Sequence, residues 1–308
     1  MARTGESIIV LGGINMDLVT FTPRFPLAGE TIVGTKFVTY PGGKGANQAV
    51  AASRSGGSVY MVGRVGSDDF GPQLIEDLNL AGVDTSGIGV SDTNSGIAII
   101  TIDDSSQNQI IQVLGANNTC GDTERIRIGE LIGTSSTLLL QLEVSIDLSL
   151  SVAKIAQEHG KTVILDPSPV RPFPEDVYRY CSVITPNETD AEALVEFAVT
   201  DLSSAERAAI TLIKRGVPNV IIKLGEHGAL YANTHDSGHI PAFNVTAIDS
   251  VGAGDAFNGA LAVALSEDLS LRDATRFASA AGALAVTKVG AQDAMPNRSD
   301  IDVLLGHL

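Results

Sequence analysis

Short, nearly continuous apolar runs alternate along the chain with segments whose apolar residues recur at helical spacing. Strands covered on both faces are apolar throughout, so the runs predict a buried, mostly parallel sheet, and the segments between them predict the covering helices. The apolar runs cover residues 7–13, 58–63, 136–143, 161–167, 181–187 and 219–225, and the helical segments cover residues 45–56, 68–82, 145–160, 190–202 and 203–216. The alternation predicts an α/β fold with a doubly wound sheet.

Two segments break this alternation. One is GETIVGTKFVTY (29–40), and the other is GIAIITIDDSSQNQIIQVLG (96–115), whose two strand-like halves meet at a polar turn over residues 104–108. We therefore expect a second, smaller β-sheet that projects from the main body.

Composition limits the classes of protein and of partner. The chain has 308 residues, of which 44% are hydrophobic and 18% charged, and its formal net charge is −16. This excess of acidic residues disfavours nucleic acids and anionic membranes as partners. No apolar run is long enough to cross a bilayer, and the start MARTGESIIVLGG lacks a secretory signal, so we expect a cytoplasmic protein. Cys120 and Cys181 are too few for a disulfide framework and are expected to be reduced thiols.

Polar side chains follow the ends of several apolar runs. In open α/β sheets, ligands bind outside the carboxyl ends of the strands. A single such residue is explained as a turn former, and Asp166 beside Pro167 is predicted to be one. The recurrence of the pattern favours a pocket for a polar ligand. Its members are Asn15, Asp17, Glu143, Asp166, Asn187 and the segment KLGEHG (223–228).

The stretch VGAGDAF (251–257) is a candidate phosphate site. The chain has no G-x-x-x-x-G-K-[ST] motif, and no G-x-G-x-x-G follows its first strand. Small residues before a helix leave the backbone amides open to an anion, and the helix dipole favours negative charge there. The alternative is a plain turn in which Asp255 caps the helix, because aspartate is among the preferred N-cap residues.

Five motifs together identify a resemblance to a known family. They are GGINMD (12–17), PGGKGANQAVAA (41–52), TPNETD (185–190), DSVGAGDAFNGALA (249–262) and AVTKVGAQDAMP (285–296). In this order, over nearly the whole chain, they resemble the ribokinase-like carbohydrate kinases. The resemblance implies a Rossmann-like αβα sandwich comprising residues 1–308 as one domain, with lid segments at about 17–41 and 95–115. It also implies transfer of the γ-phosphoryl group of ATP to the O5 hydroxyl of D-ribose, with Mg²⁺, with K⁺ as activator, and as a homodimer formed through the lids.

The resemblance also assigns roles to individual residues. Asp255 would be the general base, with Gly252, Ala253 and Gly254 forming the anion hole. The sugar hydroxyls would be held by Asn15, Asp17, Gly43, Lys44, Asn47, Glu143 and Asp255. The nucleotide would be bound by Asn187, Lys223, Gly225, Gly228, Gly254 and Ser279. Carboxylates accept hydrogen bonds from hydroxyls, amides both donate and accept, and lysine donates, so these residue types suit a sugar and a polyphosphate.

Two positions depart from the family pattern. The family has glutamate three positions after its asparagine, acting on Mg²⁺ through water, and this chain has the shorter Asp190. An outer-sphere aspartate can serve, because magnesium keeps most of its waters. The K⁺ site would use Asp249 and the carbonyls of Val251, Ala285, Lys288 and Gly290, and Ala294 offers no hydroxyl where related enzymes have one.

Several alternatives remain open. A kinase of the same family could act on another sugar or on a nucleoside, or the chain could be a catalytically inert sugar-binding regulator, although the intact GAGD motif weighs against inertness. A sugar-phosphate kinase is disfavoured because Lys44 is the one cation in the implied pocket, unless Arg24 folds in with the lid. The missing glycine fingerprint weighs against a nicotinamide oxidoreductase.

Overall fold

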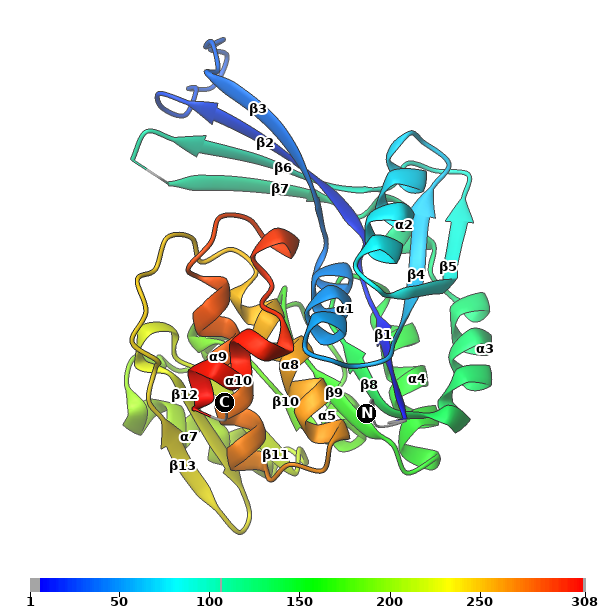
Figure 1. Cartoon of the computed structure of the whole chain (residues 1–308), viewed down its shortest axis with the longest axis vertical. Helices are drawn as coiled ribbons and strands as arrows, with labels where there is room; N and C mark the ends of the chain where they lie inside the picture. Colours follow the sequence, from blue (N-terminus) through cyan, green and yellow to red (C-terminus); the bar gives the residue numbers. More distant parts are fainter. Residues whose placement is uncertain (1–5, 106, 307–308) are drawn as a thin grey trace.

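The chain, described here by a computed structural model over residues 6–105 and 107–306, contains a large sheet and a small one (Figure 1). Within the described residues, nine strands form the large sheet. In spatial order they are β13 (Ser237–Ile240), β12 (Ala229–Asn233), β11 (Asn219–Lys223), β10 (Val183–Ile184), β9 (Thr162–Leu165), β8 (Ser135–Leu140), β1 (Ser7–Leu11), β4 (Val59–Gly66) and β5 (Asp84–Ser91). Neighbouring strands are parallel except at one edge, where β12 is antiparallel to both β11 and β13. The α/β prediction is confirmed.

Helices cover both faces of the large sheet. Ile8 and Val10 of β1 pack into one apolar cluster, and the alternate residues Ile9 and Leu11 pack into another on the opposite face. This is why the strand reads as continuously apolar. On the first face lie α1 (Lys44–Arg54), α2 (Phe70–Leu80), α8 (Ala253–Ser266), α9 (Leu271–Ala285) and α10 (Arg298–Leu305). On the second lie α3 (Asp122–Leu131), α4 (Ile146–Glu158), α5 (Asp176–Tyr180), α6 (Glu188–Val195) and α7 (Leu202–Lys214). Short 3₁₀ segments are η1 (Gly115–Thr119), η2 (Ile132–Thr134), η3 (Gly225–His227) and η4 (Gln292–Ala294).

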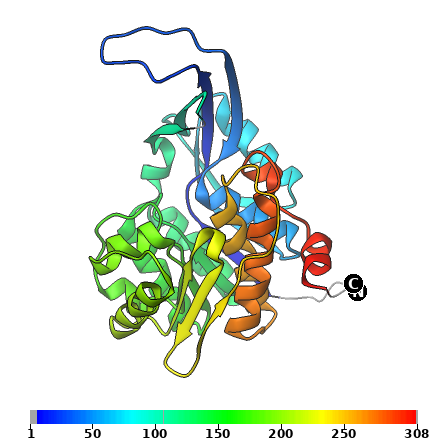
Figure 2. The same cartoon turned by 90° about the vertical axis from the view of Figure 1, so that its left-hand side faces the viewer.

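The small sheet projects from the body as expected (Figures 1 and 2). Its strand order is β3 (Lys36–Gly42), β2 (Asn15–Thr22), β6 (Gly96–Asp103), β7 (Asn108–Val113). The hairpin predicted for residues 96–115 is confirmed as β6 and β7. The prediction for 29–40 is correct only for its second half, because residues 29–35 are outside any strand. The pairing of β2 with β3 begins at Phe21 and Lys36, so residues 29–35 have no strand partner.

Some predicted boundaries were wrong. The run 181–187 supplies only the two-residue strand β10, and the helical segment predicted for 190–202 is interrupted. The helix α6 ends before Glu196, whose left-handed φ of 63° closes it, and α7 starts after Asp201, whose side chain accepts from Ser204 N. The interruption has the physical form of a helix stop followed by a new capped start.

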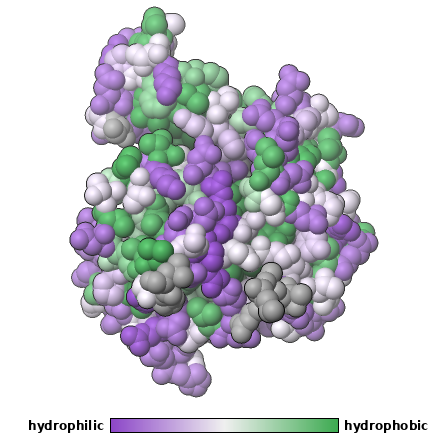
Figure 3. All heavy atoms as spheres, viewed as in Figure 1, coloured by the Kyte–Doolittle hydropathy of each residue, from purple (hydrophilic) through white to green (hydrophobic). Residues whose placement is uncertain are grey.

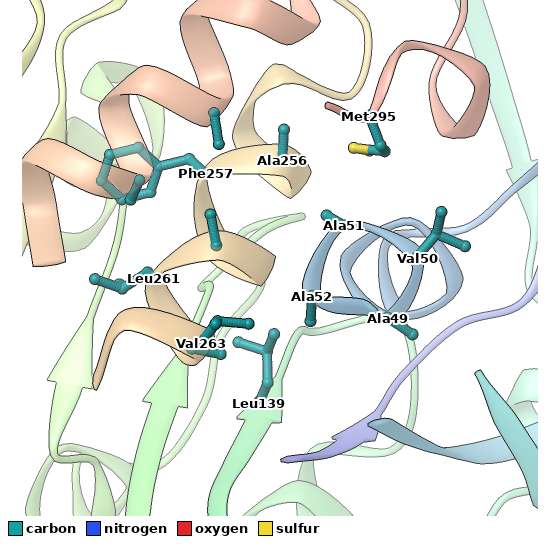
Figure 4. Packing of buried hydrophobic residues seen from close by; sticks show 14 of the residues in the cluster. Ala49, Val50, Ala51, Ala52, Leu139, Ala256, Phe257, Leu261, Val263 and Met295 are labelled. Carbon is teal, nitrogen blue, oxygen red and sulfur yellow. The ribbon is translucent and has the colours of Figure 1, made fainter. Parts of the chain in front are cut away.

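Close packing of α1 against α8 joins distant parts of the chain. Their contact is made by small residues, including Ala51, Ala52 and Ala256 (Figure 4). A Cβ added at Gly259 would lie 2.5 Å from Ala51 Cβ and 2.6 Å from Gln48 O, so glycine permits this approach. The consequence is that the start of α1 lies beside the start of α8.

The described residues include no helix that combines the length and the apolar character needed to cross a membrane. In the space-filling view, apolar and polar residues are mixed over the projecting sheet, with apolar side chains open to solvent (Figure 3). Large exposed apolar side chains of this sheet include Phe37, Ile99, Ile110, Ile111 and Val113.

Candidate active site

The site lies where the carboxyl ends of central strands meet the first turns of α1 and α8, below the projecting sheet (Figure 1). Parallel strands place their carboxyl ends at one edge of the sheet, which is why polar residues from separate runs converge. We name its two parts after the roles that the family resemblance implies for their residues. The phosphoryl end comprises Asp255, residues 252–254, Gln48, Asp166 and Lys223, and the sugar end comprises Asn15, Asp17, Lys44, Asn47, Gln112 and Glu143.

Asp255 lies in the first turn of α8, and its side chain is not a helix cap. The N-cap residue is Gly252, in the left-handed conformation with φ of 75°, and no side chain caps the helix. The Asp255 carboxylate instead accepts hydrogen bonds from Asn47 Nδ2 (3.0 Å) and Gln48 Nε2 (2.9 Å) of α1. Burial raises the pKa of Asp255, and Asp166 adds to the rise, while Lys44 opposes it. The capping alternative for Asp255 is therefore wrong.

The first turn of α8 presents backbone amides beside a lysine. The N–H groups in the first turn of a helix have no acceptor within the helix, although that of Ala253 contacts Ser250 O at 3.3 Å. A Cβ added at Gly254 would lie 3.5 Å from Lys223 Nζ. An ammonium group and open amides thus face the same space, which suits an anion such as a phosphoryl group.

Asp166 belongs to this end of the site and is more than a turn former. It is 1% exposed and accepts from Lys223 Nζ (3.2 Å) and Gln48 Nε2 (2.9 Å). Because Gln48 Nε2 also donates to Asp255, the two carboxylates share one amide. The prediction of a turn role for Asp166 was wrong, and Gln48 was missed. The GANQ motif held a signal, because it places a second amide side chain directly after Asn47 near the start of a helix.

At the sugar end, Glu143 is held through both carboxylate oxygens. Its Oε2 accepts from the backbone N–H of Lys44 (2.7 Å), and its Oε1 accepts from Gln112 Nε2 of β7 (2.5 Å). Asn15 Oδ1 accepts from Asn117 Nδ2 at 2.7 Å. Asn47 Oδ1 is buried without a hydrogen-bond partner among the described residues, so it is available to a hydroxyl donor. The sequence analysis missed Gln112 and Asn117. Nothing in the β7 sequence NQIIQV distinguishes Gln112 from the other polar residues of the strand.

Glycines allow the backbone to approach these side chains. Gly43 has φ of 88°, and a Cβ there would lie 2.6 Å from Gly13 O. At Gly42, a Cβ would lie 2.4 Å from Asp17 Oδ2. Side chains at either position would displace the wall of the site, which explains the paired glycines of the PGGKG motif.

Carboxylates dominate the electrostatics of the sugar end. The pKa of Asp17 is raised to about 7, first by burial and then by Glu143 and Asp255. Burial also raises the pKa of Glu143, against the opposing effect of Lys44. Burial alone would lower the pKa of Lys44, but Asp255, Asp166 and Glu143 outweigh it and the pKa is raised. Lys44 therefore stays charged and partly balances the acids.

Most of the predicted nucleotide residues lie around the end of β11, whereas Ser279 lies on α9. An isolated bridge pairs Asn187 with Lys223, and a loop containing Gly225 (φ 52°) and Gly228 (φ 90°) follows. Ser279 on α9 has a buried hydroxyl with no hydrogen-bond partner among the described residues. The positive φ values account for both glycines, and the free hydroxyl is available to a ligand.

The residues assigned to cations lie in two places. Asp190 and Asn187 form a capping box at the start of α6, in which Asn187 Oδ1 accepts at 2.7 Å and Asp190 Oδ2 lies 3.5 Å from Asn187 N. Asp249 accepts from Val251 N (3.0 Å) and Gly290 N (2.9 Å), which joins the two loops predicted to hold K⁺. Of the other positions, Ala285 and Ala294 are buried and Lys288 is exposed.

Two arginines bear on which sugar fits. Arg24 does not fold into the site, because it is exposed and pairs with Glu30 at the far end of the projecting sheet. Arg171 contributes a positive charge near Glu143, and its guanidinium donates to Val144 O. Lys44 is thus not the only cation near the sugar end, and this corrects the sequence-based interpretation.

Comparison with known proteins agrees with this geometry. The family model described as pfkB family carbohydrate kinase matches residues 6–298. The chain is 38% identical to ribokinase of Haemophilus influenzae over 98% of this chain and 99% of the relative, and 35% identical to deoxyribokinase of Salmonella typhimurium over 94% and 95%. It resembles the structure of Arabidopsis thaliana ribokinase complexed with ribose and ATP, with a TM-score of 0.91 and 31% identity over 98% of this chain and 99% of that one.

Proposed function

The chain belongs to the pfkB family of carbohydrate kinases, and from that premise we propose that it transfers the γ-phosphoryl group of ATP to the O5 hydroxyl of D-ribose. One observation carries the proposal. A buried carboxylate, Asp255, is held by Asn47 and Gln48 beside the open first turn of α8 and beside Lys223. The ribokinase relatives support the choice of ribose, and the ribose and ATP in the Arabidopsis thaliana structure support both substrates.

Asp255 is the general base in this proposal. It takes the proton of the attacking hydroxyl, and the amides of Gly252, Ala253 and Gly254 bind the phosphoryl oxygens as charge moves through the transition state. Lys223 lies next to those amides and adds positive charge. General-base catalysis contributes about 10²–10⁴-fold in rate, and a positioned donor of the oxyanion-hole type about 10²–10³-fold.

The sugar end suits a neutral polyol. Acceptors come from Asp17, Glu143 and the unpartnered Asn47 Oδ1, and donors come from Lys44. Asn15 and the backbone at Gly43 complete the proposed set. Asp17, Glu143 and Asp255 repel a sugar that already carries a phosphate, and these three carboxylates outnumber the two nearby cations, Lys44 and Arg171.

The nucleotide would lie along the end of β11. Its phosphates would face Asn187, Lys223, Gly225, Gly228 and Gly254, and its base would lie by the free hydroxyl of Ser279. The donor set fits Mg²⁺, because Asp190 Oδ2 makes only a 3.5 Å contact with Asn187 N and keeps acceptor capacity for a metal-bound water. When bound, Mg²⁺ neutralises charge on the phosphates.

K⁺ is proposed as an activating cation. Asp249 supplies a carboxylate that already links two loops, and the carbonyls of Val251, Ala285, Lys288 and Gly290 supply neutral oxygens. Binding there would order the loop that leads into α8. Rates measured in KCl and NaCl at matched ionic strength test this, and equal rates would contradict it.

We also propose a cytoplasmic homodimer formed through the lids, with residues 1–308 as one domain and lid segments at about 17–41 and 95–115. Ile99, Ile111 and Val113 lie on one face of the lid and are 41%, 63% and 48% exposed. An apolar sheet face of this kind is an aggregation hazard unless it is covered. Light scattering at micromolar protein should give a dimeric mass, and a strictly monomeric mass would contradict the proposal.

A substrate panel tests the function itself. ADP production is measured with pentoses, hexoses and nucleosides, and D-ribose should give the highest kcat/KM. The deoxyribokinase relative makes 2-deoxy-D-ribose the second candidate. A clear preference for adenosine or fructose would overturn the ribose assignment, and no ADP with any sugar would favour an inert sugar-binding regulator.

A further inference from the structure

One lid side chain reaches into the body from a strand that is otherwise open to solvent. All six residues of β7 are exposed, yet Gln112 Nε2 lies 2.5 Å from Oε1 of Glu143, which is 4% exposed. Among the described residues of β6 and β7, no other side chain donates a hydrogen bond to the main body. The contact is therefore a specific connection between the lid and the sugar end.

The strand register places Gln112 on the same face of the small sheet as Asp17. Asp17 of β2 pairs with Ala98 of β6, and Ala98 pairs with Gln112 of β7. Residues paired across strands project from the same face of a sheet, so these three form one row. Ala98 is 8% exposed and carries only a methyl group between two polar side chains. The row therefore presents one polar side chain on each side of a methyl group.

We propose that Gln112 is a positioning residue that sets sugar affinity and selectivity by orienting the Glu143 carboxylate when the lid is closed. The inference rests on the proposed function. It adds a lid residue that is not among the sugar-binding residues implied by the family resemblance. Lys44 N holds one oxygen of Glu143, and Gln112 fixes the other, so the carboxylate plane cannot rotate. Each oxygen still has a lone pair for a sugar hydroxyl.

A neutral amide suits this position because of the charges that face Glu143. Asp17 from β2 and Asp255 from α8 are like charges, while Lys44 from α1 and Arg171 from the loop after β9 are opposite ones. A carboxylate at 112 would add repulsion. A cation at 112 would form an ion pair with Glu143 and compete with the sugar hydroxyls for its lone pairs. The amide orients the carboxylate without neutralising it.

The test compares three single variants in the full-length protein. Gln112→Leu removes the donor at similar volume, and Gln112→Glu places a second acid against Glu143. Gln109→Leu is the matched control, because residues three apart on a strand lie on opposite faces. For each variant, kcat and both KM values are measured from pH 5 to 9, together with molar mass and thermal stability.

Gln112→Leu should raise the KM for ribose about 5–10-fold, the scale of one ordinary hydrogen bond, because Glu143 keeps its charge and its bond from Lys44 N and loses only the orienting donor. The kcat and the KM for ATP should be nearly unchanged. The acidic limb of 1/KM should move to higher pH, because a donor that favours the ionised form of Glu143 is gone. Gln112→Glu should raise KM at least about 10-fold at neutral pH, with partial recovery as the pH falls and the new acid takes up a proton. Discrimination among 1-, 2- and 3-deoxyribose should shrink in Gln112→Leu at the hydroxyl that contacts Glu143.

An unchanged KM, pH profile and discrimination in Gln112→Leu would overturn the inference. So would the same changes in Gln109→Leu, since they would show a general effect on the lid. If the wild-type protein prefers another sugar in the panel, the ribose assignment fails, and the three variants are judged by the same readouts with that sugar.

Discussion

The two ends of the site are built on different parts of the fold. The phosphoryl end is anchored in the main body: Asp166 is 1% exposed, Asp255 is 6% exposed, and both hydrogen-bond to Gln48 of α1. The sugar end takes Asp17 and Gln112 from the small sheet, which is joined to the body at its base and through one side-chain contact of β7. The difference indicates that changes at the phosphoryl end will alter kcat and stability, whereas changes at the sugar end will alter the KM for sugar.

The largest expected effect tests the phosphoryl end. Asp255→Asn keeps the shape of the side chain but cannot accept the hydroxyl proton, so kcat should fall at least about 10²-fold. Dissociation constants for ribose and ATP should change little, because the lost interaction belongs to the transition state. Steady-state ADP release and calorimetric titration measure these quantities.

Asp300→Asn is the matched control, because Asp300 occupies the third position of α10, as Asp255 does in α8. It should leave kcat unchanged. A near-normal kcat and normal stability in Asp255→Asn would remove the proposed mechanism and the distinction between the two ends.

The second prediction concerns the ion pair of the phosphoryl end. Lys223→Met leaves the buried Asp166 carboxylate without its cation, which should lower the free energy of unfolding by about 3 kcal/mol, as for other broken buried pairs. The KM for ATP should also rise, with the KM for ribose unchanged. Urea unfolding and initial rates measure the two effects.

Adding Asp166→Asn to Lys223→Met should restore much of the lost stability, because no uncompensated charge remains, while the KM for ATP stays high. Recovery of both properties together would show that Lys223 acts only in folding.

The third prediction tests the sugar end. Glu143→Ala leaves Lys44 N and Gln112 without their acceptor and removes a partner for the sugar, so the KM for ribose should rise about 10-fold or more. The fall in kcat should be smaller than that in Asp255→Asn. Glu130→Ala, at an exposed residue of α3 that pairs with Arg127, is the control and should change neither constant. An unchanged KM for ribose in Glu143→Ala would show that the sugar lies elsewhere.

The fourth prediction is a pH dependence of stability that arises from Asp17. The pKa of Asp17 is raised from 3.8 to about 7, so between these values the folded protein holds a proton that the unfolded chain has released. Binding of this proton stabilises the folded protein. The stabilisation is complete below about pH 4 and is lost as the pH rises to about 7, with a slope of at most about 1.4 kcal/mol per pH unit. The difference in unfolding free energy between wild type and Asp17→Asn measures it.

Saturating ribose should reduce this slope, because hydroxyl donors favour the ionised carboxylate. If the difference in unfolding free energy between wild type and Asp17→Asn does not change with pH in the absence of sugar, the raised pKa of Asp17 is contradicted.

Local patterns in the sequence were enough for the fold class and for much of the site. The apolar runs, the hairpin over residues 96–115 and the helix start at the GAGD motif were predicted correctly, because each depends on residues close in the chain. Errors arose where the outcome depended on distant partners. Residues 29–35 form no strand because no neighbouring strand extends to pair with them, and Asp166 is not a turn former because Lys223 and Gln48 reach it.

The sequence by itself determined which chemical groups the chain has and at which strand and helix ends they stand, because periodicity and small-residue motifs act over a few residues. Only the tertiary structure decided how those groups are paired. Asp255 is more than 200 positions from Asn47 and Gln48, and their hydrogen bonds exist because Gly259 and small alanines let α1 pack closely against α8. Gln112 meets Glu143 because the register of β2, β6 and β7 turns that one amide toward the body. Hydrogen-bond partners are chosen by packing and register across the whole fold, and neither is written in a local stretch of sequence.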